Sequence, residues 1–327
     1  MNKPLAATTL LLLACAPLLH AEAGLDTIST APAGVDGKPL TKSEELADSK
    51  AITFRHDVGI RHEVRADYSY VGDAKLKSGG SGDLGEQSSH FAYGVTIPLD
   101  AKWSLRAGLG ENRLDFGRPA GSPLPQTLQT LSFNIGAGYK IDEKWSAFAG
   151  VSPRLSLMEG WDHVNSQEVE FGGALGAVYV VNKDLIFTFG LAVNPGTDGL
   201  PVMPIAGVRW VFEKDWTLNV GMPRTSIDYQ LLPNLRLSPL VFGFEGGSYH
   251  TSKNYGTAYG MPQLNDRKVR YNEVRVGVGA GYTILPNLTA DLTGGVIAYR
   301  NFDFKDSGYS AKTDPAPYVQ VGLKLGF

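Results

Sequence analysis

Histidines beside hydroxyl and acidic residues are the positions in this chain best suited to nucleophilic or acid–base chemistry. His163 lies in the segment W-D-H-V-N-S and is followed by Glu168, and His90 and His250 each come within two positions of a serine. A hydrolase needs a nucleophile, a base and an orienting group, which barrel enzymes collect from several strands. These short pairings lack the specificity of a catalytic motif, and histidines in loops or at strand ends account for all of them. We therefore expect no enzyme, and a lipid hydrolase is the weakest of the alternatives.

A second histidine pattern concerns metal binding. The tripeptides R-H-D and R-H-E place His56 and His62 six positions apart. Two histidines on one strand supply too few ligands for a tetrahedral site, so we expect no metal. The GxxxxGK[ST] spacing of a phosphate loop is absent from the sequence, and the V-G-V-G-A-G run from Val276 to Gly281 fits a strand better. We expect no cofactor.

The elements that would position these residues are strands, and the last stretch of the chain shows this most clearly. From Ala316 to Phe327 the sequence A-P-Y-V-Q-V-G-L-K-L-G-F alternates apolar side chains with polar or small ones. Side chains on a strand point to opposite faces with period two, so one face can meet lipid and the other water. The same alternation recurs in Gln129–Lys140, Glu273–Ile284 and Leu288–Tyr299. A soluble sandwich would show it too, so alternation alone does not decide the class.

Short polar turns recur between the alternating segments. L-D-A-K-W-S begins at Leu99, I-D-E-K-W-S at Ile141 and F-E-K-D-W-T at Phe212, with V-N-K-D-L at Val181 as a weaker copy, and two further turns use Pro-Asn. Asp, Asn and Pro are residues that tight turns favour. The Trp that follows three of these turns, together with the terminal Phe, predicts an aromatic girdle at the headgroup layer. Its members are Trp103, Trp145, Trp216 and Phe327.

Longer connections rich in Gly, Ser, Asn and Asp alternate with these turns. They cover about residues 78–86, 119–126, 159–167, 194–201, 251–267 and 302–315. If short and long connections alternate along the chain, the short ones lie at one end of a barrel and the long ones at the other. This arrangement is typical of transmembrane β-barrels, which have short periplasmic turns and long external loops. We expect an antiparallel barrel of about 12–14 strands, and 14 requires a hairpin at Met222-Pro223-Arg224 with two strands of about seven residues each. If that segment is instead one kinked strand or folds inward, 12 is the expected number.

Composition and the amino terminus agree with export to a membrane. The chain has 327 residues, 39 glycines and a net charge of −3, and its mean hydropathy is −0.11. We predict a signal peptide over residues 1–23, a flexible periplasmic segment over 24–50 and a barrel over 51–327. The one cysteine, Cys15, lies in the signal, where a lipobox-like L-L-A-C leaves lipidation as an alternative. The near-neutral charge gives no reason to expect nucleic acid.

The signal, the D-x-K-W turns and the terminal Phe together resemble bacterial outer-membrane β-barrel proteins, over about residues 52–327. The segment G-M-P-R-T-S-I-D-Y from Gly221 and the L-S-P-L from Leu237 resemble an uncharacterised barrel family known only as a domain of unknown function. The resemblance implies a bacterial outer-membrane location, contact with outer-membrane lipid, and recognition of the C-terminal strand, which ends at Phe327, by the barrel-assembly machinery. It brings no catalytic residues.

If the apolar strand faces meet lipid, the opposite faces point charged side chains into the lumen. These candidates could line a wetted channel, or pair with one another and fill a narrow interior, and a loop or the amino-terminal segment could also occupy it. Our leading hypothesis is a porin-like channel for passive or weakly selective passage of small solutes. The alternative is a structural or surface-binding barrel that acts through external loops, with Tyr249, Tyr255 and Tyr259 as stacking residues or as a second girdle. The lumen-lining candidates are Arg106, Lys140, Arg154, Glu170, Arg209, Asp228, Arg236, Glu273, Arg275, Asp291 and Lys324.

Overall fold

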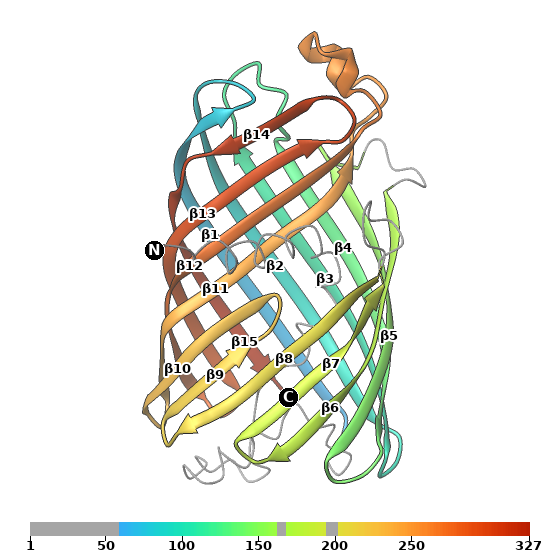
Figure 1. The fold of residues 1–327 in the computed structure, drawn as a ribbon, viewed down its shortest axis with the longest axis vertical. Helices are drawn as coiled ribbons and strands as arrows, with labels where there is room; N and C mark the ends of the chain where they lie inside the picture. Colours follow the sequence, from blue (N-terminus) through green and yellow to red (C-terminus); the bar gives the residue numbers. More distant parts are fainter. Residues whose placement is uncertain (1–58, 162–167, 194–201) are drawn as a thin grey trace, which may run out of the picture.

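The computed structural model describes residues 59–161, 168–193 and 202–327. These residues form one antiparallel sheet that closes on itself (Figure 1). No helix in the described ranges is long and apolar enough to cross a membrane. The predicted signal peptide and the 24–50 segment lie outside the described residues, as do His56 and His163. The strands are β1 (Arg61–Ser78), β2 (Asp83–Pro98), β3 (Trp103–Gly117), β4 (Thr127–Lys140), β5 (Trp145–Met158), β6 (Val169–Asn182), β7 (Leu185–Val193), β8 (Val202–Glu213), β9 (Trp216–Val220), β10 (Arg224–Leu232), β11 (Leu235–His250), β12 (Lys268–Leu285), β13 (Leu288–Phe304), β14 (Tyr309–Thr313) and β15 (Ala316–Gly326).

The wall has 14 strands, because β14 and β15 are two pieces of the last one. Both pieces pair with β13 on one side and with β1 on the other. The ladder between β15 and β1, which includes Tyr70 opposite Val319, closes the barrel. A hairpin at Met222-Pro223-Arg224 is present, with strands of 5 and 9 residues in β9 and β10. The even number of strands predicted from that hairpin is confirmed, and the alternative of 12 is wrong.

Apolar side chains cover the outer face of the wall. Leu109, Phe171 and Leu323 are all more than half exposed, at 54, 63 and 52 %, although each lies within a strand. Their neighbours along the strand point inward, so the alternation seen in the sequence separates an apolar exterior from a polar interior. This is the surface of a transmembrane β-barrel, in which the apolar band meets the hydrocarbon.

Short turns join the strands at one end of the barrel, which we call the turn end. In three of them one side chain holds the turn in the same way. The Oδ1 atoms of Asp100, Asp142 and Asn182 each accept the backbone N–H groups two and three residues further on, at 2.7–2.9 Å. These two hydrogen bonds lower the pKa of the Asp142 carboxyl in its exposed turn. The recurring Asp or Asn of the sequence is therefore the residue that closes the hairpin.

Aromatic rings surround the turn end. Each Trp that follows a turn packs against a Tyr at the foot of a neighbouring strand, and the terminal Phe stacks on a His of β1. The centroid distances are 4.6 Å for Trp103 with Tyr139, 4.5 Å for Trp145 with Tyr179, 4.8 Å for Trp216 with Tyr229 and 5.2 Å for Phe327 with His62. The four residues of the predicted girdle thus all lie at the turn end, and a role in the headgroup layer, which amphipathic rings suit, stays a prediction.

The opposite end, which we call the loop end, is more ordered than the sequence suggests. Residues 78–86 were expected to form a loop, but β2 begins at Asp83 and the connection is short. The expected loop 302–315 contains the end of β13 and all of β14. The 251–267 connection carries two short 3-10 helices, η3 (Gly256–Tyr259) and η4 (Pro262–Leu264). Several residues expected in loops therefore belong to strands, and the wall continues further toward the loop end than the sequence predicts.

The wall narrows toward the loop end. The β9–β10 hairpin is short, and β10 pairs with β11 only as far as Gly243. Beyond that point β11 has no ladder with β10 and instead approaches β5 (Figure 1). Its inward side chains reach other strands: Asn112 donates to Glu245 at 3.0 Å, and the Tyr249 hydroxyl lies 3.3 Å from that of Thr130. Strands β7–β10 therefore enclose mainly the turn-end half of the interior.

Candidate functional site

Strand register places all eleven lumen-lining candidates on inward positions. Seven lie toward the turn end and four toward the loop end, so they belong to two different environments. The turn-end members are Arg106, Lys140, Arg209, Asp228, Arg236, Asp291 and Lys324, and the loop-end members are Arg154, Glu170, Glu273 and Arg275.

Side chains close the loop end of the interior. A buried apolar cluster, which we call the loop-end core, fills the space between the upper parts of β2, β3, β4, β11, β12 and β13. At its centre the rings of Phe116, Tyr271 and Phe302 contact one another with centroid distances of 5.0–5.6 Å. Interiors packed in this way leave few voids larger than a water molecule. The loop-end core consists of Leu84, Leu114, Phe116, Leu124, Leu128, Tyr249, Tyr255, Leu264, Val269, Tyr271, Phe302, Phe304 and Ala311.

The connecting loops contribute to this core. Tyr255, beside η3, donates its hydroxyl to the carbonyl of Pro123 at 2.8 Å, and burial raises its pKa. The guanidinium of Arg118 lies over the ring of Tyr259, 5.4 Å from its centroid. Tyr249 and Tyr255 are almost fully buried. The prediction that these two tyrosines form a stacking surface or a second girdle is therefore wrong, because they face the interior instead of solvent or lipid.

Directly beneath the loop-end core lies a buried group of four charged residues, the ion cluster of Glu86, Glu273, Arg275 and Arg300. Arg300 lies 2.8 Å from both carboxylates, and Arg275 lies 2.6 Å from Glu273 and 3.2 Å from Glu86. The hydroxyl of Tyr271 donates to both acids, at 2.9 and 2.7 Å. Within these four residues two acids face two guanidiniums, and a fifth, partly exposed carboxylate, that of Glu245, lies 2.8 Å from Arg275. Pairing of this kind is what burial of ions requires. The cluster ties β2 to β12 and β13 across the interior.

Two members of the ion cluster were absent from the lumen candidates. Glu86 was assigned to a loop, although it lies in β2 and is 2 % exposed. Arg300 follows a β-bulge, where Val274 pairs with Tyr299 but Arg275 pairs with Ile297. A bulge adds one residue and so exchanges the faces of all that follow. The loop boundary and the bulge are both features that alternation alone does not reveal.

Between the ion cluster and the turns lies a more polar space, which we call the turn-end chamber. Most of its acids are engaged in pairs. Arg236 donates to Asp291 at 2.8 Å, and Arg65 donates to Asp67 at 2.7 Å. The charged residues on its inward faces are the basic Arg61, Arg65, Arg106, Lys140, Arg209, Arg224, Arg236 and Lys324, and the acidic Glu63, Asp67, Asp228 and Asp291.

Inward glycines make room for these cross-strand pairs. A Cβ atom on Gly281 would lie 2.8 Å from Oδ1 of Asp291 and 2.9 Å from Nη2 of Arg236, so a larger residue would obstruct their bridge across β12. Gly322 stands in the same relation to Asp67, at 2.3 Å from Oδ1. The small residues of the inward faces therefore leave space, and long charged side chains occupy part of it.

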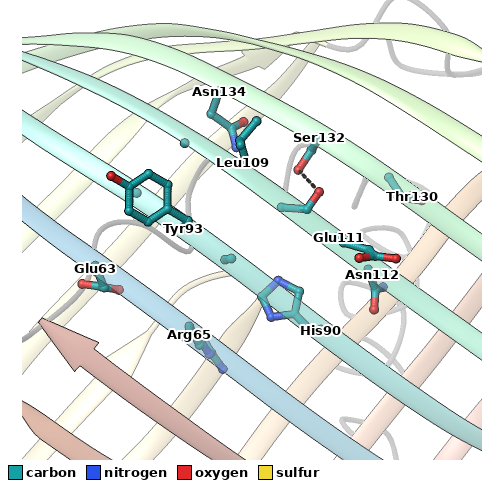
Figure 2. A pocket seen from close by; sticks show the side chains of 14 residues that line it. Glu63, Arg65, His90, Tyr93, Leu109, Glu111, Asn112, Thr130, Ser132 and Asn134 are labelled. Carbon is teal, nitrogen blue, oxygen red and sulfur yellow. Dashed lines mark hydrogen bonds between the residues drawn. The ribbon is translucent and has the colours of Figure 1, made fainter.

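One wall of the chamber holds a recess formed by β1, β2, β3 and β4 (Figure 2). Its volume of about 70 Å³ is several times the roughly 10–15 Å³ that one water molecule requires. Arg65, His90, Asn112 and Asn134 supply charged and amide groups to it, and Ser132 donates to the carbonyl of Gly110 at 3.4 Å. The recess can hold water or a small polar group.

The histidine patterns do not assemble a catalytic or metal site in the described part of the chain. Nδ1 of His90 lies 3.3 Å from Asp67, but its neighbour Ser89 projects from the opposite face of β2. Nδ1 of His250 lies 3.4 Å from the carbonyl of Thr251. Within the described ranges no group of three His, Cys, Asp or Glu residues could hold a metal ion.

Comparisons with known proteins give a family and a set of distant structural likenesses. A family model described as a domain of unknown function, DUF6268, matches residues 64–326. No curated protein matches the sequence. The TodX monoaromatic hydrocarbon channel, as a mutant, is 12 % identical with a TM-score of 0.46, over 82 % of this chain and 90 % of that one. A Pseudomonas aeruginosa FadL homologue is 12 % identical with a TM-score of 0.46, over 90 % and 96 %. An outer-membrane channel from Pseudomonas putida F1 is 10 % identical with a TM-score of 0.43, over 83 % and 96 %.

Proposed function

Because the chain belongs to the DUF6268 family, a domain of unknown function that assigns no activity, we propose its function from the interior of the barrel. The protein lies in the bacterial outer membrane and passes small polar solutes through the turn-end chamber. The observation that carries this proposal is a charged, partly open chamber inside a transmembrane wall. A barrel that served only as a scaffold would gain nothing from inward arginines that lack partners, because such groups are costly to bury.

A solute in the chamber would contact charged side chains and would have space for accompanying water molecules. Arg224 remains exposed within it, and the recess beside His90 has room for several water molecules. Polar and charged linings of this kind replace part of the hydration shell of a solute and set its selectivity. A solute entering at the turn end would therefore meet hydrogen-bonding groups.

Passage beyond the chamber requires movement at the loop end. The ion cluster and the loop-end core together fill the interior there, since Arg300, Phe302 and Leu114 are all at most 1 % exposed. A solute can cross only when these contacts separate. We therefore expect brief openings of low conductance instead of the steady current of a wide porin.

The test measures the conductance of the refolded barrel in a planar bilayer. Two variants are compared, each with a single cysteine introduced on one of the two faces of the same strand. Asn134 lines the recess, and its neighbour Ile135 is 47 % exposed on the outer face of β4. Asn134→Cys and Ile135→Cys are each treated with a negatively charged methanethiosulfonate. The natural sequence has one cysteine, Cys15, which lies in the predicted signal peptide, so the introduced cysteine is the intended target of the reagent.

We expect small discrete steps from wild type, a marked loss of current when the reagent modifies Asn134→Cys, and no change for Ile135→Cys. A folded barrel that never conducts would refute passage through the interior. Equal block of both cysteine variants would show that the current does not run through the chamber.

The last strand fits the proposed assembly in the outer membrane. Phe327 stacks on His62 at the turn end, and Gly326 pairs with Glu63 to complete the ladder of β15 with β1. The C-terminal strand is thus the closing strand, and its recognition by the barrel-assembly machinery remains part of this proposal.

A further inference from the structure

The charges of the turn-end chamber do not balance. Its eight basic residues face four acids, as set out above. The neighbouring ion cluster and Glu245, which lies 2.8 Å from Arg275, add only one carboxylate in excess of their two guanidiniums, so the basic residues still predominate. An enclosed lining of one dominant sign raises the local concentration of ions of the opposite sign.

Each acid of the chamber is already engaged. Asp67 accepts from Arg65, Asp291 from Arg236, and Glu63 lies 3.6 Å from Lys324. Asp228 accepts only neutral donors, namely the amide of Asn219 at 2.9 Å and the hydroxyls of Ser226 and Ser238 at 3.1 and 2.6 Å. Hydrogen bonds from hydroxyl and amide groups satisfy this carboxylate without neutralising its charge.

Among the remaining basic residues, Arg209 and Arg224 form no ion pair within the described part of the chain, although the carboxylate of Asp228 lies in the neighbourhood of both. Nη1 of Arg209 is buried and has no hydrogen-bond partner among the described residues. The side chain of Arg224 makes no hydrogen bond or ion pair with the part of the chain that the structure describes, and the residue is exposed. A buried guanidinium nitrogen without a partner is costly, so Arg209 is suited to a ligand that supplies the missing acceptor. The exposed guanidinium of Arg224 has donors available to the same ligand.

The two arginines stand on neighbouring strands around a polar row. Arg209 of β8 pairs with Asn219 of β9, and Asn219 pairs with Ser226 of β10. Arg224 occupies the next inward position of β10. Strands lie about 4.8 Å apart, so the two Cα atoms are separated by roughly 10–12 Å, a span that two extended arginine side chains can close around a small molecule.

We propose that Arg209 and Arg224 form a binding site for a small solute that carries carboxylate groups, and that the solutes of the proposed passage are therefore anionic. The planar guanidinium donates two parallel N–H groups and matches a carboxylate in bidentate geometry. Asn219 and Ser226 stand between the two arginines in the sheet and donate to Asp228, so the guanidiniums themselves supply the donors for the solute. This inference names the solute class of the proposed function and rests on it only for its biological use, since binding is measurable without passage.

The test is calorimetric titration of the folded, full mature barrel in detergent with succinate, and with succinamide as its uncharged counterpart. We expect succinate to bind and succinamide not to bind. Arg209→Gln and Arg224→Gln should each weaken succinate binding by about tenfold or more, because each removes charged hydrogen bonds. Arg224→Lys keeps the charge but loses the bidentate geometry, so it should retain part of the affinity.

Arg113→Gln is the matched control. Arg113 lies on the outer face of β3, paired with Asp115 at 2.9 Å, so its loss removes the same charge from outside the chamber. A heat-dependent shift in electrophoretic mobility checks that every variant is folded. Equal binding of succinate and succinamide, absence of succinate binding, or equal weakening by Arg113→Gln would each overturn the proposal.

The two proposals fail differently. Succinate binding to a barrel that never conducts would refute passage and leave the anion site standing. Conduction by a barrel that does not distinguish succinate from succinamide would support passage and overturn the site.

Discussion

Arg300 of β13 and Glu86 of β2 meet inside the barrel with 2.8 Å between Nη2 and Oε2, and both side chains are fully buried. Two wall strands, β1 and the split last strand β14–β15, lie between β2 and β13 in the sheet. The pair therefore bridges the interior instead of following the wall. Together with the loop-end core above it, this contact lies across the route that the proposed passage would take.

Loss of the Glu86 charge should destabilise the barrel strongly. Glu86→Gln leaves Arg300 with Glu273 alone, while Arg275 keeps Glu273 and Glu245. Breaking a buried ion pair costs about 3–5 kcal/mol. The free energy of unfolding by urea from lipid vesicles measures the effect. Asp115→Asn breaks the exposed pair with Arg113 on the outer face and should cost less than about 1 kcal/mol. Similar losses for the two variants would contradict a structural role for the ion cluster.

A cavity in the loop-end core should both weaken and open the barrel. Leu114 is 1 % exposed in that core, so Leu114→Ala should cost about 2–5 kcal/mol and raise the frequency of conducting steps in a bilayer. Leu109→Ala, on the lipid-facing side of the same strand, is the control. If Leu114→Ala lost stability without any rise in conductance, the loop-end core would be a structural element and not the barrier to passage.

The Asp142 turn should be sensitive to acid. Its carboxylate accepts the N–H groups of Lys144 and Trp145, which lowers the pKa of Asp142. A carboxyl with a lowered pKa stabilises the folded state above its ordinary pKa, and this contribution is lost as the pH falls through the lowered value. We therefore expect Asp142→Ala to be less stable than wild type at neutral pH and to approach it in acid, as urea unfolding at several pH values would reveal.

Asn182 supplies the comparison for that turn, because its amide oxygen makes the same two hydrogen bonds without a charge. Asp142→Asn should keep most of the stability at neutral pH and lose the acid dependence. An unchanged acid dependence in Asp142→Asn would locate the titrating group elsewhere.

The sequence by itself determined the wall. Strand alternation depends only on the two-residue period of extended backbone, and the D-x-K-W turns depend on hydrogen bonds between residues three positions apart or fewer. Such local effects can be predicted from the sequence because they do not depend on tertiary contacts. The strands, the turns capped by Asp100 and Asp142 and the position of the aromatic residues up to Phe327 follow from them. The choice between 12 and 14 strands does not, because only the structure shows the hairpin between β9 and β10.

Only the tertiary structure decided what fills the interior. Whether inward charges line water or pair with one another depends on contacts such as Glu86 with Arg300, between residues far apart in the chain. The bulge before Arg300 exchanged the two faces of β13, and no local pattern marks it. Tyr249 and Tyr255 have the composition of a surface loop, yet they lie in the loop-end core because strands brought from elsewhere bury them. The closed loop end and the unpaired Arg209 and Arg224 are consequences of long-range packing, which alternation leaves open.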